Sequence, residues 1–182
     1  MSKLLKGGLV HKYANTVKTF TMPFSVFKKA TDLTANPPAA DSTNLTIVTG
    51  TYGTNAATIQ SADGKAATTS PKTRFQFAVP PTYQAGGAIS VIVNAGMLTT
   101  VADTSCTLKV DCYRPAAPTT NIGPIAQSIN SLTAADKTFA LTTTSVVPGD
   151  ILDIDLVAAI TDGATGTVVK AKINKVQIQL IA

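Results

Sequence analysis

Glutamate and tryptophan are absent from the 182 residues, and histidine occurs once. All ten acidic residues are therefore aspartates, and the chain has 29 threonines and 26 alanines. A chain without Glu and with abundant Thr and Val lacks many of the residues that favour helix interiors and is rich in those that favour strands. The composition predicts an all-β domain, and the length suits one ordinary domain with an extension.

The single histidine and the absence of glutamate argue against catalysis, and no motif indicates a bound cofactor. Nucleophilic catalysis needs a base held rigidly beside the nucleophile, and the single histidine, His11, lies near the N-terminus. The pairs Gly7-Gly8 and Gly86-Gly87 do not match a phosphate-binding or dinucleotide fingerprint. We expect no enzyme activity, and a hydrolase is the least favoured function.

The tightest acidic cluster is in the segment "DILDID", residues 150–155. Asp153 and Asp155 share a strand face and carry oxygens of the kind that Ca²⁺ prefers, but the segment lacks EF-hand spacing. A solvated outer strand face explains the cluster without a ligand, so we expect no metal site.

Long apolar runs are also missing. None reaches the roughly 18 residues of a membrane helix. Lys6, Gly7, Gly8, His11 and Lys12 interrupt the apolar segment that a signal peptide would need. We expect no membrane partner, and synthesis in a host cytoplasm-like compartment.

The two cysteines do not form a disulfide framework. Cys106 and Cys112 lie in "SCTLKVDCY", which alternates like a strand, so they are separated by roughly 20 Å. A disulfide needs Cα atoms within about 7 Å. We expect two buried thiols that are not bonded to each other.

Positive charge is concentrated at the N-terminus. Six of the 15 basic residues precede residue 30 with no acid among them, so the net charge of +5 resides there. Half of the six phenylalanines lie there too. We therefore divide the chain into a basic arm, 1–30, and a β-sandwich domain, 31–182. The candidate binding residues of the arm are Lys3, Lys6, Lys12, Lys18, Phe20, Phe24, Phe27, Lys28 and Lys29.

Three interpretations of this arm stay open. Lysines that steer toward an acidic surface, with aromatic rings that fill pockets, suit a protein partner. Nucleic acid is less favoured because the arm has no arginine and its lysines are dispersed among apolar groups. The third interpretation is that residues 16–27 form a first strand of the domain itself.

Short apolar runs separated by turn signals predict eight strands, near 45–49, 56–60, 73–79, 88–95, 105–113, 138–143, 150–161 and 167–180. Loops of uneven length favour a jelly roll or related β-sandwich over an up-and-down barrel. An immunoglobulin-like sandwich is the nearest competitor, although the missing Trp and the Cys spacing do not fit its core. One stretch, "SINSLTAAD", suits a short helical turn.

The last two strands predict a hairpin with a bulge. Pairing Thr161 with Gly166 places Leu156 opposite Ala171 and Asp155 opposite Lys172, an opposite-charge cross-strand pair. The apolar alternation slips by one residue at 174–175, which indicates a β-bulge.

Three stretches resemble a group of structural proteins of tailed bacteriophages: "NLTIVTGTYGTNAATIQSADGKAA", "GAISVIVNAGMLTTVADTSCTLKVDCYRP" and "SINSLTAADKTFALTTTSVVPGDILDIDLVAAITDGATGTVVKAKINKVQIQL". The resemblance covers roughly residues 40–181, and "AGMLTTVADTS" and "PGDILDIDLVAAITD" are its most distinctive pieces. Capsid decoration (cement) proteins of this group form trimers of jelly rolls over capsomer junctions. The Lys-rich start departs from the group.

The resemblance implies a structural virion protein on the outer capsid surface. Its partners would be the major capsid protein and itself, as a homotrimer, with no nucleic acid. The alternative is a receptor- or glycan-binding module of a phage head fibre or tail spike, since jelly rolls often bind sugars. Copy number per virion separates the two roles, because cement proteins are present in hundreds of copies and fibres in tens or fewer.

Overall fold

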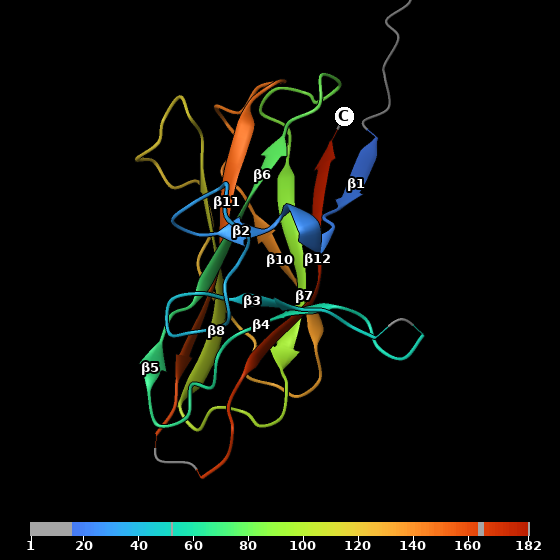
Figure 1. Cartoon of the computed structure of the whole chain (residues 1–182). Coiled ribbons are helices and arrows are strands. Elements are labelled where there is room, and N and C mark those ends of the chain that lie inside the picture. Colours follow the sequence, from blue (N-terminus) through green and yellow to red (C-terminus); the bar gives the residue numbers. More distant parts are fainter. Residues whose placement is uncertain (1–15, 52, 164–165, 182) are drawn as a thin grey trace, which may run out of the picture.

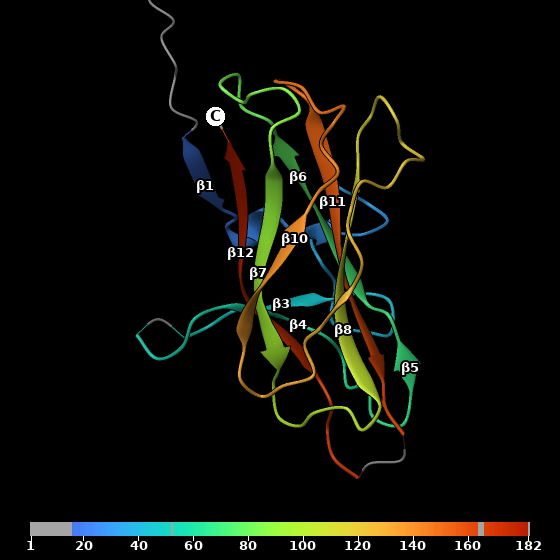
Figure 2. The same ribbon diagram turned by 180° about the vertical axis from the view of Figure 1, so that it is seen from behind.

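The computed structural model describes residues 16–51, 53–163 and 166–181. They form two antiparallel, six-stranded sheets packed face to face as a jelly-roll-like β-sandwich (Figure 1). Its helical content is a single 3₁₀ turn, η1, Phe24–Val26. Seen from behind, the two sheets run the length of the molecule, and the β3–β4 hairpin projects sideways (Figure 2).

The first sheet, sheet A, has the order β10-β7-β12-β4-β3, with β1 also paired to β12. Its strands are β1 Val17–Thr21, β3 Thr46–Val48, β4 Thr58–Gln60, β7 Ile89–Met97, β10 Ala135–Ala140 and β12 Ala171–Ile181.

The second sheet, sheet B, has the order β2-β6-β11-β8-β9, with β5 also paired to β11. Its strands are β2 Lys28–Lys29, β5 Thr68–Thr69, β6 Lys72–Ala78, β8 Ser105–Tyr113, β9 Gln127–Ser128 and β11 Ile151–Thr161.

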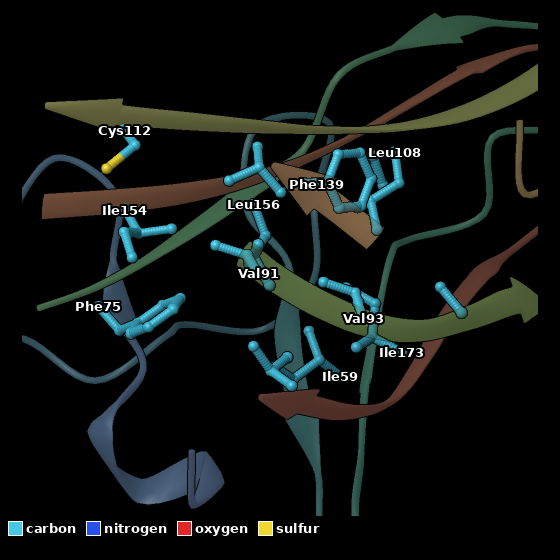
Figure 3. Close-up of a cluster of buried hydrophobic side chains, with 14 of the residues drawn as sticks. Ile59, Phe75, Val91, Val93, Leu108, Cys112, Phe139, Ile154, Leu156 and Ile173 are labelled. Atoms are coloured by element: carbon cyan, nitrogen blue, oxygen red, sulfur yellow. The ribbon is translucent and has the colours of Figure 1, made fainter. Parts of the chain in front are cut away.

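Alternating side chains of both sheets fill the core between them. Every second residue of β8 and of β11 is buried, as a strand with one buried face requires. Ile154 and Leu156 of β11 face Val91 and Val93 of β7, with Phe139 of β10 packed beside them (Figure 3). Residues of the opposite phase are therefore left on the outer faces of the sandwich.

The predicted strands are largely confirmed. The structure places β8 at 105–113 and β11 at 151–161, as expected, and shifts β10 to 135–140. The short strands β2, β5 and β9 were missed, because two-residue strands carry no periodicity. Residues 131–133 form bends rather than the expected helical turn.

The predicted hairpin of the last two strands is wrong. β11 lies in sheet B between β6 and β8, whereas β12 lies in sheet A beside β7. Alternation and charge define the face of a strand but not its partner, and the connection here crosses from one sheet to the other. The bulge is confirmed, since the β12–β7 register shifts between Ile173 and Lys175.

Residues 17–29 belong to the sandwich, as the third interpretation of the arm held. β1 pairs with β12 in sheet A and β2 pairs with β6 in sheet B. The segment thus connects one edge of each sheet, with η1 between them (Figure 1). This position makes residues 17–29 a strap across the open side of the sandwich.

The three phenylalanines of this strap point into the protein. The Phe27 ring is completely buried, 4.8 Å from the ring of Phe75. Phe20 packs edge-on against Phe77, and Phe24 packs against Phe27. Rings that fill pockets of a partner must be accessible, and for Phe27 that expectation is wrong because the domain's own core already buries it.

Two of the three strap lysines have side-chain partners within the chain. Lys18 Nζ donates to Thr82 Oγ1 at 3.0 Å, and Lys28 Nζ donates to Asn36 Oδ1 at 2.9 Å. Lys29 donates its backbone N–H to the carbonyl oxygen of Ala35. Lys3, Lys6 and Lys12 lie outside the described residues, and so does His11.

Both thiols are free and fully buried on the inner face of β8, as expected. Burial raises the pKa of both Cys106 and Cys112 to about 12. The thiolate, which is the reactive form, is therefore scarce in the folded protein.

We expect both thiols to resist a thiol-specific reagent at pH 8 in the native protein. After unfolding in guanidinium, two thiols per chain should react within minutes, because the unfolded pKa is near 8.5. Titration with a chromogenic disulfide measures both states. Rapid labelling of the native protein would contradict the burial of β8.

We expect Phe27→Ala to lower the free energy of unfolding by about 3–5 kcal/mol, as for other buried Phe-to-Ala changes. The matched control is Phe24→Ala. Because Phe24 is only partly buried, this substitution should lower the free energy of unfolding by a smaller amount. Urea unfolding measures both. Equal, small losses would show that the strap is not part of the cooperative core.

Candidate cleft on the outer face of sheet B

Charged side chains gather on the outer face of β6, β11 and β8. The strand register places Arg74, Asp155 and Asp111 in one row across the three strands. The row above it holds Gln76, Asp153 and Tyr113. This placement follows from the alternation, which buries Leu152, Ile154 and Leu156 and turns their neighbours outward.

Each aspartate of the "DILDID" segment pairs with a different cation. Arg74 donates from Nε and from its terminal nitrogen to the two carboxylate oxygens of Asp153. Lys72 Nζ lies 3.8 Å from Asp155 Oδ2, and Arg114 Nη1 lies 3.2 Å from Asp150 Oδ2. The partner expected for Asp155, Lys172, is in the other sheet.

A cavity of about 450 Å³ opens on this face. β6 and β11 contribute Lys72, Arg74, Asp153 and Asp155, and the end of β8 contributes Tyr113. The remaining lining comes from Ala30, Arg114, Pro115 and Pro118. We call this cavity the sheet B cleft.

Asp155 has unused hydrogen-bonding capacity within this cleft. Its side chain is only 18% exposed, and its Oδ1 atom is buried without a hydrogen-bond partner. On the neighbouring strand β8, Asp111 lies directly opposite Asp155. Asp111 forms an ion pair with Lys109 and accepts a hydrogen bond from the Asn121 amide. Desolvation, opposed by Lys72 and Arg74 and reinforced by Asp153 and Asp111, raises the pKa of Asp155.

Arg114 also has a buried polar atom without a hydrogen-bond partner. Its guanidinium donates to the carbonyl oxygen of Ser145 and to Asp150 Oδ2, while its Nε is buried without a partner. Buried polar groups are nearly always hydrogen-bonded, so two such atoms in residues that line one cleft need a physical explanation. For Asp155, rotation of the carboxylate toward a polar ligand in the cleft would supply the missing partner.

The cleft therefore combines planar charged groups with one half-buried aromatic ring. Guanidinium and carboxylate groups bind pairs of hydroxyls through two hydrogen bonds at once. The Tyr113 ring offers an apolar face with a hydroxyl at its rim. Since a carboxylate rotates easily about its last bond, Asp155 Oδ1 can be turned toward a ligand.

The sequence predicted part of this site. The three aspartates were assigned to a solvated outer face, and two of them line the cleft instead. Arg74, Arg114 and Tyr113 were not singled out, because they are distant in sequence and only the strand register brings them together. In the described part of the chain, no group of three or more Asp, His or Cys side chains is placed to hold a metal ion.

No protein-family model matches the chain, and no curated protein sequence matches it. Among solved structures, a xylan-binding module, CBM15, is similar with a TM-score of 0.49 and 17% identity over 92% of this chain and 97% of that one. A family 16 carbohydrate-binding module has a TM-score of 0.46 and 13% identity, covering 75% and 85%. The enzymatically active domain of tailspike protein 4 of bacteriophage CBA120 has a TM-score of 0.46 and 9% identity, over 91% of this chain and 19% of that one.

These similarities concern the β-sandwich fold, and no residue of the cleft is assigned from them.

Among the described residues, no helix is long and apolar enough to cross a membrane.

We expect Asp155→Asn to raise the free energy of unfolding at pH 7 by up to about 1 kcal/mol, because it removes a desolvated negative charge directly opposite Asp111. Because the pKa of Asp155 is raised by folding, its charged form is disfavoured in the native state, and this cost disappears as the pH falls below about 4. The stabilisation should thus be present at pH 7 and lost near pH 3. Urea unfolding at both pH values measures it.

The matched control is Asp153→Asn, which removes a carboxylate with two hydrogen bonds to Arg74 and should destabilise the protein at pH 7. If Asp155→Asn destabilises it equally, Asp155 is satisfied in solution and the cleft has no unused acceptor.

Proposed function

We propose that this protein is a non-enzymatic binding module that holds a neutral glycan in the sheet B cleft. The observation that carries the proposal is one cavity whose lining brings together two guanidinium groups, two carboxylates and the Tyr113 ring. An acceptor and a donor beside an aromatic ring match the hydroxyls and the apolar face of a sugar ring.

The cations that line the cleft are each paired with an aspartate, which favours a neutral ligand. Four basic residues pair one to one with four aspartates: Lys72 with Asp155, Arg74 with Asp153, Lys109 with Asp111, and Arg114 with Asp150. The net charge of these eight groups is zero. A surface that selects a polyanion carries an excess of positive charge, so sulfated glycans and nucleic acids are poor candidates.

Of the two roles predicted from the sequence, we therefore favour the glycan-binding module over capsid decoration. The strap contributes to this preference, since the aromatic ring of Phe27 is committed to the core. Placement on a virion, contact with a major capsid protein and a homotrimeric state stay predictions from the resemblance.

The test is affinity gel electrophoresis on native gels that contain a neutral polysaccharide, with a panel of plant and bacterial-surface glycans. We expect at least one neutral polymer to retard the protein, with little change between 50 and 500 mM salt. Tyr113→Ala should weaken this binding about tenfold, roughly 1.4 kcal/mol, through loss of the ring contact. Thr138→Ala, on the exposed face of β10 in the other sheet, is the matched control and should bind normally.

Two results would contradict the proposal. One is retardation only by anionic polymers with a steep salt dependence. The other is a Tyr113→Ala variant that stays folded and binds like the parent.

A further inference from the structure

A second cavity, of about 330 Å³, lies on the other sheet, between the β3–β4 hairpin and β12. We call it the sheet A groove. Figure 1 shows this hairpin projecting from the edge of the sandwich beside β12. The groove is lined by Val48, Thr49, Gly50, Asn55, Ala56, Thr58, Gln60, Leu98, Lys172 and Asn174.

Lys172 is the only charged residue of this lining. In the register of sheet A it lies between Gln60 of β4 and Gly96 of β7, neither of which is acidic. None of the ion pairs of the described residues includes it. By contrast Lys175, three residues further along β12, is paired with Asp136 at 3.6 Å.

The β-bulge of β12 places an amide in the lining of the same groove. Asn174 is the extra residue of the bulge, since Ile173 pairs with Ala95 and Lys175 pairs with Asn94. Its Nδ2 donates to Asn94 Oδ1 at 2.9 Å, which orients the amide. Bulges commonly redirect a side chain next to a functional site.

Two more side-chain amides are held in fixed orientations. Gln60 Nε2 donates to Thr58 Oγ1 at 2.9 Å, and Asn55 Oδ1 accepts the N–H of Thr51 at 2.6 Å. The groups left over are the Gln60 and Asn174 oxygens as acceptors and Asn55 Nδ2 as a donor. The hairpin wall is closely packed, because a Cβ on Gly50 would lie 1.9 Å from the Asn55 carbonyl oxygen.

We propose that the sheet A groove is a second ligand site, specific for a carboxylate-bearing sugar such as a uronic acid residue. Lys172 pairs with the carboxylate, the amides of Asn174, Gln60 and Asn55 bond the neighbouring hydroxyls, and Val48 and Leu98 contact the apolar face of the ring. The unpaired ammonium group distinguishes this groove from the sheet B cleft, in which each lining cation is paired with an aspartate.

The probe is an oligogalacturonate of four units, with its fully methyl-esterified form as the neutral analogue. In titrations of the ¹⁵N-labelled full chain at 20 mM salt, we expect backbone amide shifts in β4 and around residues 172–174, with saturation in the millimolar range or below. Esterification should weaken binding at least tenfold, and added salt should weaken the acid form, as screening requires.

Variants separate this site from the sheet B cleft. Lys172→Gln should lower affinity for the acid oligomer about tenfold, while Lys137→Gln, on β10 of the same sheet, should leave it unchanged. Asp155→Asn and Tyr113→Ala should also leave the affinity for the acid oligomer unchanged. The proposals for the two sites can therefore be contradicted separately. The proposal is overturned if the acid oligomer does not bind, if Lys172→Gln binds it normally, or if the esterified form binds equally well.

Discussion

The packing of two sheets through their inner faces is the constraint on which the rest of this structure depends. Because side chains alternate along a strand, burying Leu152, Ile154 and Leu156 of β11 leaves Asp153 and Asp155 on the outer face. The same phase in β6 and β8 brings Arg74 and Tyr113 to that face. The core and the sheet B cleft are thus two consequences of one register.

That register also creates the least favourable contact of the outer face. Asp155 and Asp111 are directly opposite each other on β11 and β8, and like charges in that position are destabilising. Lys72 and Lys109 relieve part of this repulsion, yet one oxygen of Asp155 stays buried and unsatisfied. Natural proteins tolerate such costs mainly at functional sites, which is the physical basis for placing the ligand here.

Several features could be predicted from the sequence, whereas others depend on strand pairing between distant segments. Alternation was sufficient to locate β8 and β11, and a single phase slip located the bulge at residue 174, because both signals are local. The partner of β11 was not local: Lys72, some 80 residues earlier, replaces the expected Lys172. The arm was misjudged for a related reason, since the same alternation of apolar residues suits a strand on a foreign surface and a strand on the domain's own β12.

The residues of the sheet B cleft could not be predicted from the sequence for the same reason. Nothing in the local sequence around Arg74, Arg114 or Tyr113 marks a site, and they converge only because β6 and β8 flank the same strand. The bulge residue Asn174 was predicted as a backbone irregularity, whereas its position in the sheet A groove depended on the β3–β4 hairpin lying beside β12.

The most direct measurement is an NMR titration that follows the side-chain Nε–H signals of the two arginines. Arg74 and Arg114 are the only arginines in the chain, and both line the sheet B cleft, so each signal reports on this site without ambiguity. With a neutral oligosaccharide taken from the best-bound polymer, we predict saturable shifts of both signals, because a ligand in the cleft changes the surroundings of both guanidinium groups. Binding that leaves both arginine signals unchanged would contradict it.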